Sequence, residues 1–287
     1  MKNPQKSLSH VIHEAQFRKL QSLSSSNRDR ARLLSVSAPQ ANDWVSALPI
    51  DALGLRVECR TFRIMVRRLL GIPLFDCHGE SISPRVCQRC LTPSLDEYGD
   101  HSLVCRRGHD KFLRHNWIRD TLVTALRGAG ILASVETPHL LDNPNLKPGD
   151  FTVPSSSPSA NLDAFDVTIV DPLQISFLHD AAKTGGVAAR SREASKMSKY
   201  QQLCAQAHIN FTPLVWETFG GSTDITRGVL KQWTKLEANR TGEDRELVYT
   251  SLFQLVSVRL QVSNARMILR SIGTSTCPRV LGGEEDK

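Results

Sequence analysis

Four residues with side chains that zinc prefers lie close together in "VCQRCLTPSLDEYGDHSLVC", in the pattern C-x2-C-x10-H-x3-C. Cysteines spaced this way can hold one ion from a tight turn, and the H-x3-C pair points one way from a helical turn. A closed shell of four N and S ligands predicts a structural zinc ion rather than a catalytic one. The ligands are Cys87, Cys90, His101 and Cys105, although Cys77 or His78 could replace one of them, and buried free cysteines are the alternative.

Acidic residues stand on predicted strands further along the chain. In "DAFDVTIV", alternation puts Asp166 on the face opposite to Phe165 and Val167. Asp150 begins another strand in "LKPGDFTV", directly after a Pro-Gly turn. If these strands are neighbours, the two carboxylates could share a divalent cation, and oxygen ligands favour Mg²⁺ or Mn²⁺. Glu136, at the end of "ILASVE", could be a third ligand.

The chain as a whole is basic, with 36 Lys and Arg against 29 Asp and Glu, a net charge of +7. This balance favours an anionic partner such as nucleic acid. A metal-binding acid pair on a basic protein suggests hydrolysis of phosphodiester bonds, for which a lysine near the phosphate is useful. Lys196 and Lys199 lie on one helical face in "REASKMSKYQQL". Taken singly, each of these acids and lysines could instead be an ordinary solvated residue, Asp166 least of all.

The order of helical and strand patterns predicts an α/β fold with a mixed sheet. Four short runs are typical of strands: "ILASVE", "DFTV", "DAFDVTIV" and "INFTPLVWE". Helical periodicity is expected around residues 59–70, 187–207 and 246–272, and in "HDKFLRHNWIRDTLVTALRGAG" with Phe112, Trp117, Leu122 and Leu126 inward.

Together, these motifs resemble the C-terminal region of reverse-transcriptase-like proteins of non-LTR retrotransposons, where a zinc knuckle precedes a restriction-like PD-(D/E)xK endonuclease. The resemblance runs from about residue 34 to 270. Its motifs are the cysteine and histidine pattern with Asp96 and Gly99, the pair Arg114 and His115, Val135 with Glu136, "KPGD" at 147–150, "FDVT" at 165–168, and Lys196, Lys199 and Tyr200.

The resemblance implies roles for these residues. Asp150 and Asp166 would bind the catalytic metal, and Glu136 would be an accessory acid. Thr168 stands where the common form of the motif has its lysine, so the catalytic lysine would be Lys196 or Lys199 on the following helix. We expect the nucleic-acid backbone to contact basic side chains, namely Arg60, Arg63, Arg67, Arg114 and His115.

The expected organisation has five segments. They are a largely flexible, basic and Ser-rich N-terminus (1–42), a helical segment (43–76), a zinc knuckle (77–108), a restriction-like core of mixed sheet flanked by helices (109–235), and a C-terminal helix with an acidic tail (236–287). No apolar run is long enough for a membrane span, and the start lacks the apolar stretch of a secretory signal. An intracellular protein without membrane contact is expected.

The expected function is that of a Mg²⁺- or Mn²⁺-dependent DNA endonuclease in the nucleus, with RNA as the other possible partner. Two alternatives are a catalytically inactive nucleic-acid-binding remnant of the same fold and a zinc-stapled protein-interaction domain. Salt-dependent DNA binding separates the last from the others, and cleavage separates the first two.

Overall fold

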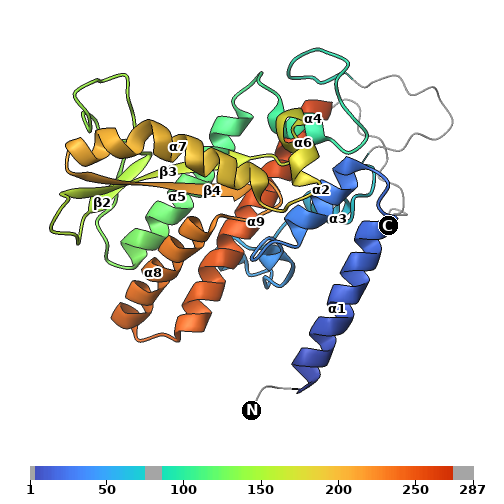
Figure 1. Cartoon of the computed structure of the whole chain (residues 1–287), viewed down its shortest axis with the longest axis horizontal. Helices are drawn as coiled ribbons and strands as arrows, with labels where there is room; N and C mark the ends of the chain where they lie inside the picture. Colours follow the sequence, from blue (N-terminus) through green and yellow to red (C-terminus); the bar gives the residue numbers. More distant parts are fainter. Residues whose placement is uncertain (1–3, 75–85, 274–287) are drawn as a thin grey trace.

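The computed structural model, which describes residues 4–74 and 86–273, contains a four-stranded sheet of order β1-β2-β3-β4, seen in the left half of Figure 1. Neighbouring strands are antiparallel from β1 to β3, whereas β3 and β4 are parallel. The predicted α/β class with a mixed sheet is therefore confirmed. The strands are β1 (Ser134–Val135), β2 (Phe151–Pro154), β3 (Leu162–Val170) and β4 (Ile209–Glu217).

The ladder between β2 and β3 ends close to the two predicted acids. Its last pair on that side is Phe151 with Phe165, so Asp150 directly precedes the paired part of β2 and Asp166 directly follows Phe165 on β3. The Asp150 amide donates to the Phe165 carbonyl at 2.8 Å, which keeps this residue against β3. Gly149 permits the close approach, because a Cβ there would lie 3.1 Å from the Cβ of Ala164.

Helices cover both faces of the sheet (Figure 1). The long crossover helix α7 (Val187–Gln206) connects β3 to β4 and packs on one face, following the short α6 (Ile175–Ala181). The opposite face packs against three helices, α5 (Asp110–Gly128), α8 (Asp224–Thr241) and α9 (Arg245–Ile272).

Alternation along β3 decides which residues meet which layer. Phe165 and Val167 enter the main core beneath α5, α8 and α9, together with Phe151 and Leu214. Ala164 lies in the smaller cluster on the α7 side. Asp166 has the same parity as Ala164, so its side chain faces α7.

The N-terminal region differs from the flexible arm expected over residues 1–42. Helix α2 (Asn27–Val36) buries Ala31 and Ser35, and the Ser35 hydroxyl donates to the Glu217 carboxylate at 2.5 Å. Helix α2 is held against the rest of the molecule because Ala31 is buried there and Ser35 forms this hydrogen bond.

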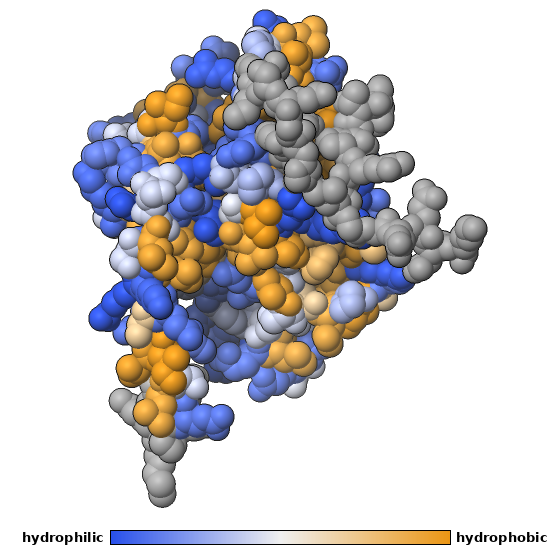
Figure 2. Space-filling model, turned by 90° about the vertical axis from the view of Figure 1, so that its right-hand side faces the viewer, coloured by the Kyte–Doolittle hydropathy of each residue, from blue (hydrophilic) through white to orange (hydrophobic). Residues whose placement is uncertain are grey.

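Helix α1 (Pro4–Leu23) instead projects away from the body (Figure 1). It leaves apolar side chains in solvent, seen as orange surface at the lower left of Figure 2; these are Leu8, Val11, Ile12, Leu20 and Leu23.

The remaining elements are two 3-10 turns (Asp43–Val45 and Asp51–Leu53), α3 (Cys59–Leu70) and α4 (Asp100–Val104). None of the described helices combines the length and apolar character needed to cross a lipid bilayer.

The expected boundary between residues 235 and 236 falls inside α8, which is continuous across it. Leu230 of α8 and Leu252 and Leu260 of α9 pack in the same main core as the sheet, so the C-terminal helices are part of that core. The acidic tail lies outside the described residues, as do the alternative zinc ligands Cys77 and His78.

Candidate functional site

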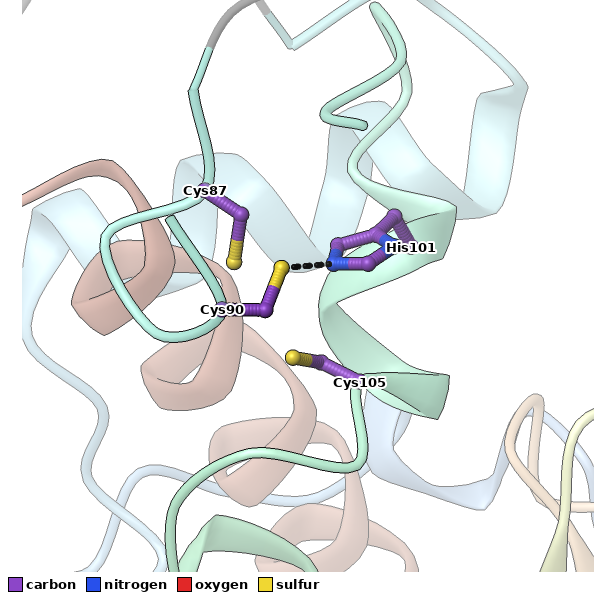
Figure 3. A group of neighbouring side chains, drawn as sticks. All are labelled: Cys87, Cys90, His101 and Cys105. Carbon is purple, nitrogen blue, oxygen red and sulfur yellow. Dashed lines mark hydrogen bonds between the residues drawn. The ribbon is translucent and has the colours of Figure 1, made fainter. Parts of the chain in front are cut away.

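The four predicted zinc ligands form one cluster, called here the Cys/His cluster (Figure 3). Cys87 and Cys90 come from a loop, whereas His101 lies on α4 and Cys105 directly follows it. Their ligand atoms all lie within 4.8 Å of one another. Two sulfurs of a tetrahedral zinc site are about 3.8 Å apart, given Zn–S bonds of about 2.3 Å. The cluster could therefore hold a zinc ion with only small side-chain shifts.

Local structure explains why this segment brings its ligands together. The Asp96 carboxylate accepts hydrogen bonds from the backbone amides of Tyr98, Asp100 and His101, which shapes the turn into α4. Gly99 has a φ of 73°, and a Cβ there would lie 3.1 Å from Leu74. Both residues of the D-x2-G-x-H motif thus position His101.

Hydrogen bonding and burial act differently on two of the thiols. A hydrogen bond from Thr92, aided by Ser94, lowers the pKa of Cys90 to about 5. Burial raises the pKa of Cys105 to about 11. Because zinc binds thiolates, an ion bound here would displace the proton of Cys105.

A second group of predicted residues lines a cleft of about 850 Å³. Asp150 approaches it from the position directly before β2, Asp166 from the middle of β3, Lys196 from α7 and His115 from α5. The structure thus brings together both acids and one of the two candidate lysines.

Each acid in the cleft has partners from the protein. Lys196 Nζ lies 2.8 Å from Asp166 Oδ1, and the Thr168 hydroxyl donates to Asp166 Oδ2 at 3.0 Å. His115 Nε2 lies 3.1 Å from Asp150 Oδ1, and the amide of Val167 donates to Asp150 Oδ2 at 2.6 Å. Thr168 occupies the position at which the common motif has its lysine, and here its hydroxyl donates a hydrogen bond to the Asp166 carboxylate.

The electrostatic balance at Asp166 is set mainly by its burial. Desolvation raises the pKa of Asp166, and the nearby carboxylate of Asp150 raises it further, whereas Lys196 lowers it.

Glu136 and Lys199 are not brought into this group. The Glu136 carboxylate accepts from Arg119 at 2.9 Å and lines a neighbouring cavity that also includes Asp150. Glu136 has a positive φ of 49°, which turns the chain out of the two-residue strand β1. Lys199 is exposed and lies 4.5 Å from the ring centroid of Tyr200.

The residues expected to contact nucleic acid divide into two groups. Arg60, Arg63 and Arg67 lie on α3 outside the residues that line the cleft, and Arg67 donates to the carbonyl of Pro73.

Arg114 lines the cleft but is only 4% exposed, and its guanidinium donates to Asn264 at 2.8 Å. Burial lowers the pKa of Arg114 to about 10. A role for Arg114 in binding the nucleic-acid backbone is therefore not favoured, because its N–H donors face the protein interior.

The sequence patterns did not single out several residues of this cleft. Arg106, Lys111 and Arg192 are exposed cations on its lining. Asp171, directly after β3, is 2% exposed, and its Oδ2 atom has no hydrogen-bond partner among the described residues. The sequence did contain a signal for Asp171, since it is an acidic residue directly after an apolar strand. The three cations come from separate segments of the chain, and only the folded structure brings them to one cleft.

Comparison with known proteins adds no relative: no protein-family model and no curated protein matches this sequence.

Proposed function

We propose that this protein is a Mg²⁺- or Mn²⁺-dependent endonuclease that hydrolyses phosphodiester bonds of DNA in the nucleus. Its core would be restriction-endonuclease-like, and the Cys/His cluster would hold a structural zinc ion. The observation that carries the proposal is the meeting of Asp150, Asp166 and Lys196 at one cleft. Two carboxylates that line one cleft suit Mg²⁺, which proteins bind by one or two carboxylates together with water and phosphate oxygens.

A divalent cation bound there would lower the pKa of a bound water and offset charge on the phosphate. The protein's own groups have separable roles. Asp150 and Asp166 would hold the cation, which relieves their mutual repulsion. Lys196 would then be available to stabilise the negative charge that develops on the phosphate oxygens. The exposed cations Arg106, Lys111 and Arg192 on the cleft would attract the DNA backbone.

The test is nicking of supercoiled plasmid in the presence of Mg²⁺. We expect Asp166→Asn to reduce cleavage by more than about 100-fold, because it removes a metal ligand, while DNA binding is retained. The matched control is Asp163→Asn on the same strand: Asp163 accepts from Asn210 at 2.7 Å and does not line the cleft. Cleavage by Asp166→Asn at the wild-type rate would reject the site.

A second candidate is a nucleic-acid-binding protein of the same fold that has lost catalysis. It is favoured by the observation that a protein side chain already contacts each acid, Lys196 contacting Asp166 at 2.8 Å and the His115 imidazole contacting Asp150 at 3.1 Å. Unchanged plasmid at saturating protein, together with a salt-sensitive gel shift, would leave only this candidate.

A further inference from the structure

A second cavity, of about 420 Å³, adjoins the acidic cleft. Phe112 and Asp150 line both, so the two are joined at the residues that carry the proposed chemistry. The smaller cavity lies between the start of α5 and the loop that precedes β2.

The lining of this cavity differs in character from that of the cleft. It is rich in proline and leucine, with an exposed histidine and one lysine; among its residues are Pro138, His139, Leu140, Leu141, Lys147 and Pro148. Such a surface suits a flat, mainly apolar group with polar edges, and a cation near its rim suits one attached to a phosphate.

Phe112 is the unusual member of the lining. Helical periodicity predicted that it would be buried, yet it is 57% exposed. A phenylalanine left in water at the junction of two cavities gains free energy when an aromatic ligand covers it. Nucleobases stack on aromatic side chains whatever their identity, because every base has a π face.

We propose that the smaller cavity is a subsite for an unpaired nucleobase that stacks on Phe112, next to the phosphodiester held at Asp150. This rests on the proposed function for the position of the phosphate. A base inside a duplex cannot enter such a cavity without leaving the stack. The preferred substrate is therefore DNA with an unpaired nucleotide at the cleavage position.

The test measures binding without cleavage, by fluorescence anisotropy with Mg²⁺ omitted. The probes are oligothymidylate, an abasic oligodeoxynucleotide of equal length, and a blunt duplex. We expect the wild type to bind oligothymidylate more tightly than the abasic strand. Phe112→Ala should weaken oligothymidylate binding by about tenfold, the effect of losing one stacked base, and leave the other two probes unchanged. Phe112→Tyr should retain the wild-type preference.

Leu113→Ala is the matched control, because Leu113 is the next residue of α5, is also exposed and lines neither cavity. Equal affinity of the wild type for oligothymidylate and abasic DNA would overturn the subsite, as would an equal loss on both in Phe112→Ala. The readout is independent of catalysis. Base-dependent binding with no Mg²⁺-dependent cleavage of either plasmid or a duplex that carries one unpaired nucleotide would reject the endonuclease and keep the subsite, whereas cleavage without base-dependent binding would do the reverse.

Discussion

Lys196 and Lys199 lie on the same side of α7, but their surroundings differ. Lys196 is 33% exposed and its ammonium group touches the buried carboxylate of Asp166. Lys199 points to the ring of Tyr200 and solvent. A cation held against a metal-binding acid is positioned for a phosphate at the same site, and a cation on an aromatic ring outside the cleft is not.

This contrast predicts which lysine the proposed reaction needs. Lys196→Ala should lower kcat for plasmid cleavage by about 100-fold or more, the range seen when one preorganised charge-stabilising group is removed. Lys199→Ala should cleave at the wild-type rate. Single-turnover cleavage at saturating protein measures both. A loss in Lys199→Ala alone would move the role to the other lysine.

At the scale of elements, three segments meet at Glu217, the last residue of β4. Its carboxylate accepts from the Ser35 hydroxyl of α2 at 2.5 Å and from the Ala189 amide in the first turn of α7 at 3.4 Å. Glu217 is 1% exposed, and its burial raises its pKa. Through these hydrogen bonds, the Glu217 side chain connects α2 to the sheet and to α7, the helix that carries Lys196.

The raised pKa predicts how stability depends on pH. An acid whose pKa is higher in the folded state than in the unfolded state contributes stability that is full below the unfolded pKa and lost as pH rises through the folded pKa. Glu217→Gln removes this titration. The free energy of unfolding of Glu217→Gln, relative to that of the wild type, should therefore increase as the pH is raised from 4 to 8. Urea denaturation at the two pH values measures this difference.

The control for this comparison is Glu243→Gln, at an exposed position in the turn between α8 and α9. Its difference from wild type should be the same at both pH values. If the Glu217→Gln difference is equally flat, the buried carboxylate is not a source of the pH dependence.

At the scale of the whole molecule, the Cys/His cluster joins segments distant in sequence. The amide of Gln88 donates to the Ser271 carbonyl of α9 at 2.8 Å. Asp110, the first residue of α5, pairs with Arg89 at 2.9 Å and with Arg270 at 2.6 Å. The same helix α5 carries Phe112 and His115, so the cluster supports the wall of the acidic cleft.

Loss of metal should consequently destabilise the whole fold, because the binding free energy of a structural zinc ion is also folding free energy. Cys90→Ser should lower Tm by at least about 5 °C, which corresponds to a few kcal/mol for a chain of this size. A chelator should lower the Tm of the wild type and have little effect on Cys90→Ser.

Cys59→Ser is the control, since Cys59 is an exposed free thiol outside the cluster. It should melt like the wild type and respond equally to chelator. Two results together would show that the cluster is not a metal site. The wild-type Tm would be insensitive to chelator, and metal analysis of the purified wild type would find no bound zinc.

Local patterns in the sequence determined much of this protein. Short β-branched and apolar runs marked all four strands, and the cysteine and histidine spacing marked the cluster, because both depend on residues near one another in the chain. Helix α8 was not singled out. The loop before it and its mixed polar composition resemble ordinary surface, and only packing of Leu230 and Trp233 against the sheet gives it a buried face.

Which side chains meet across the fold was decided by tertiary structure alone. Packing of α7 on β3 places Lys196, and not Lys199, on Asp166. Packing of α5 places His115 on Asp150 and leaves Phe112 in solvent. Periodicity states which face of a helix or strand a residue occupies, but the partner across the interface depends on the register and rotation of whole elements, which follow from how all the cores pack together.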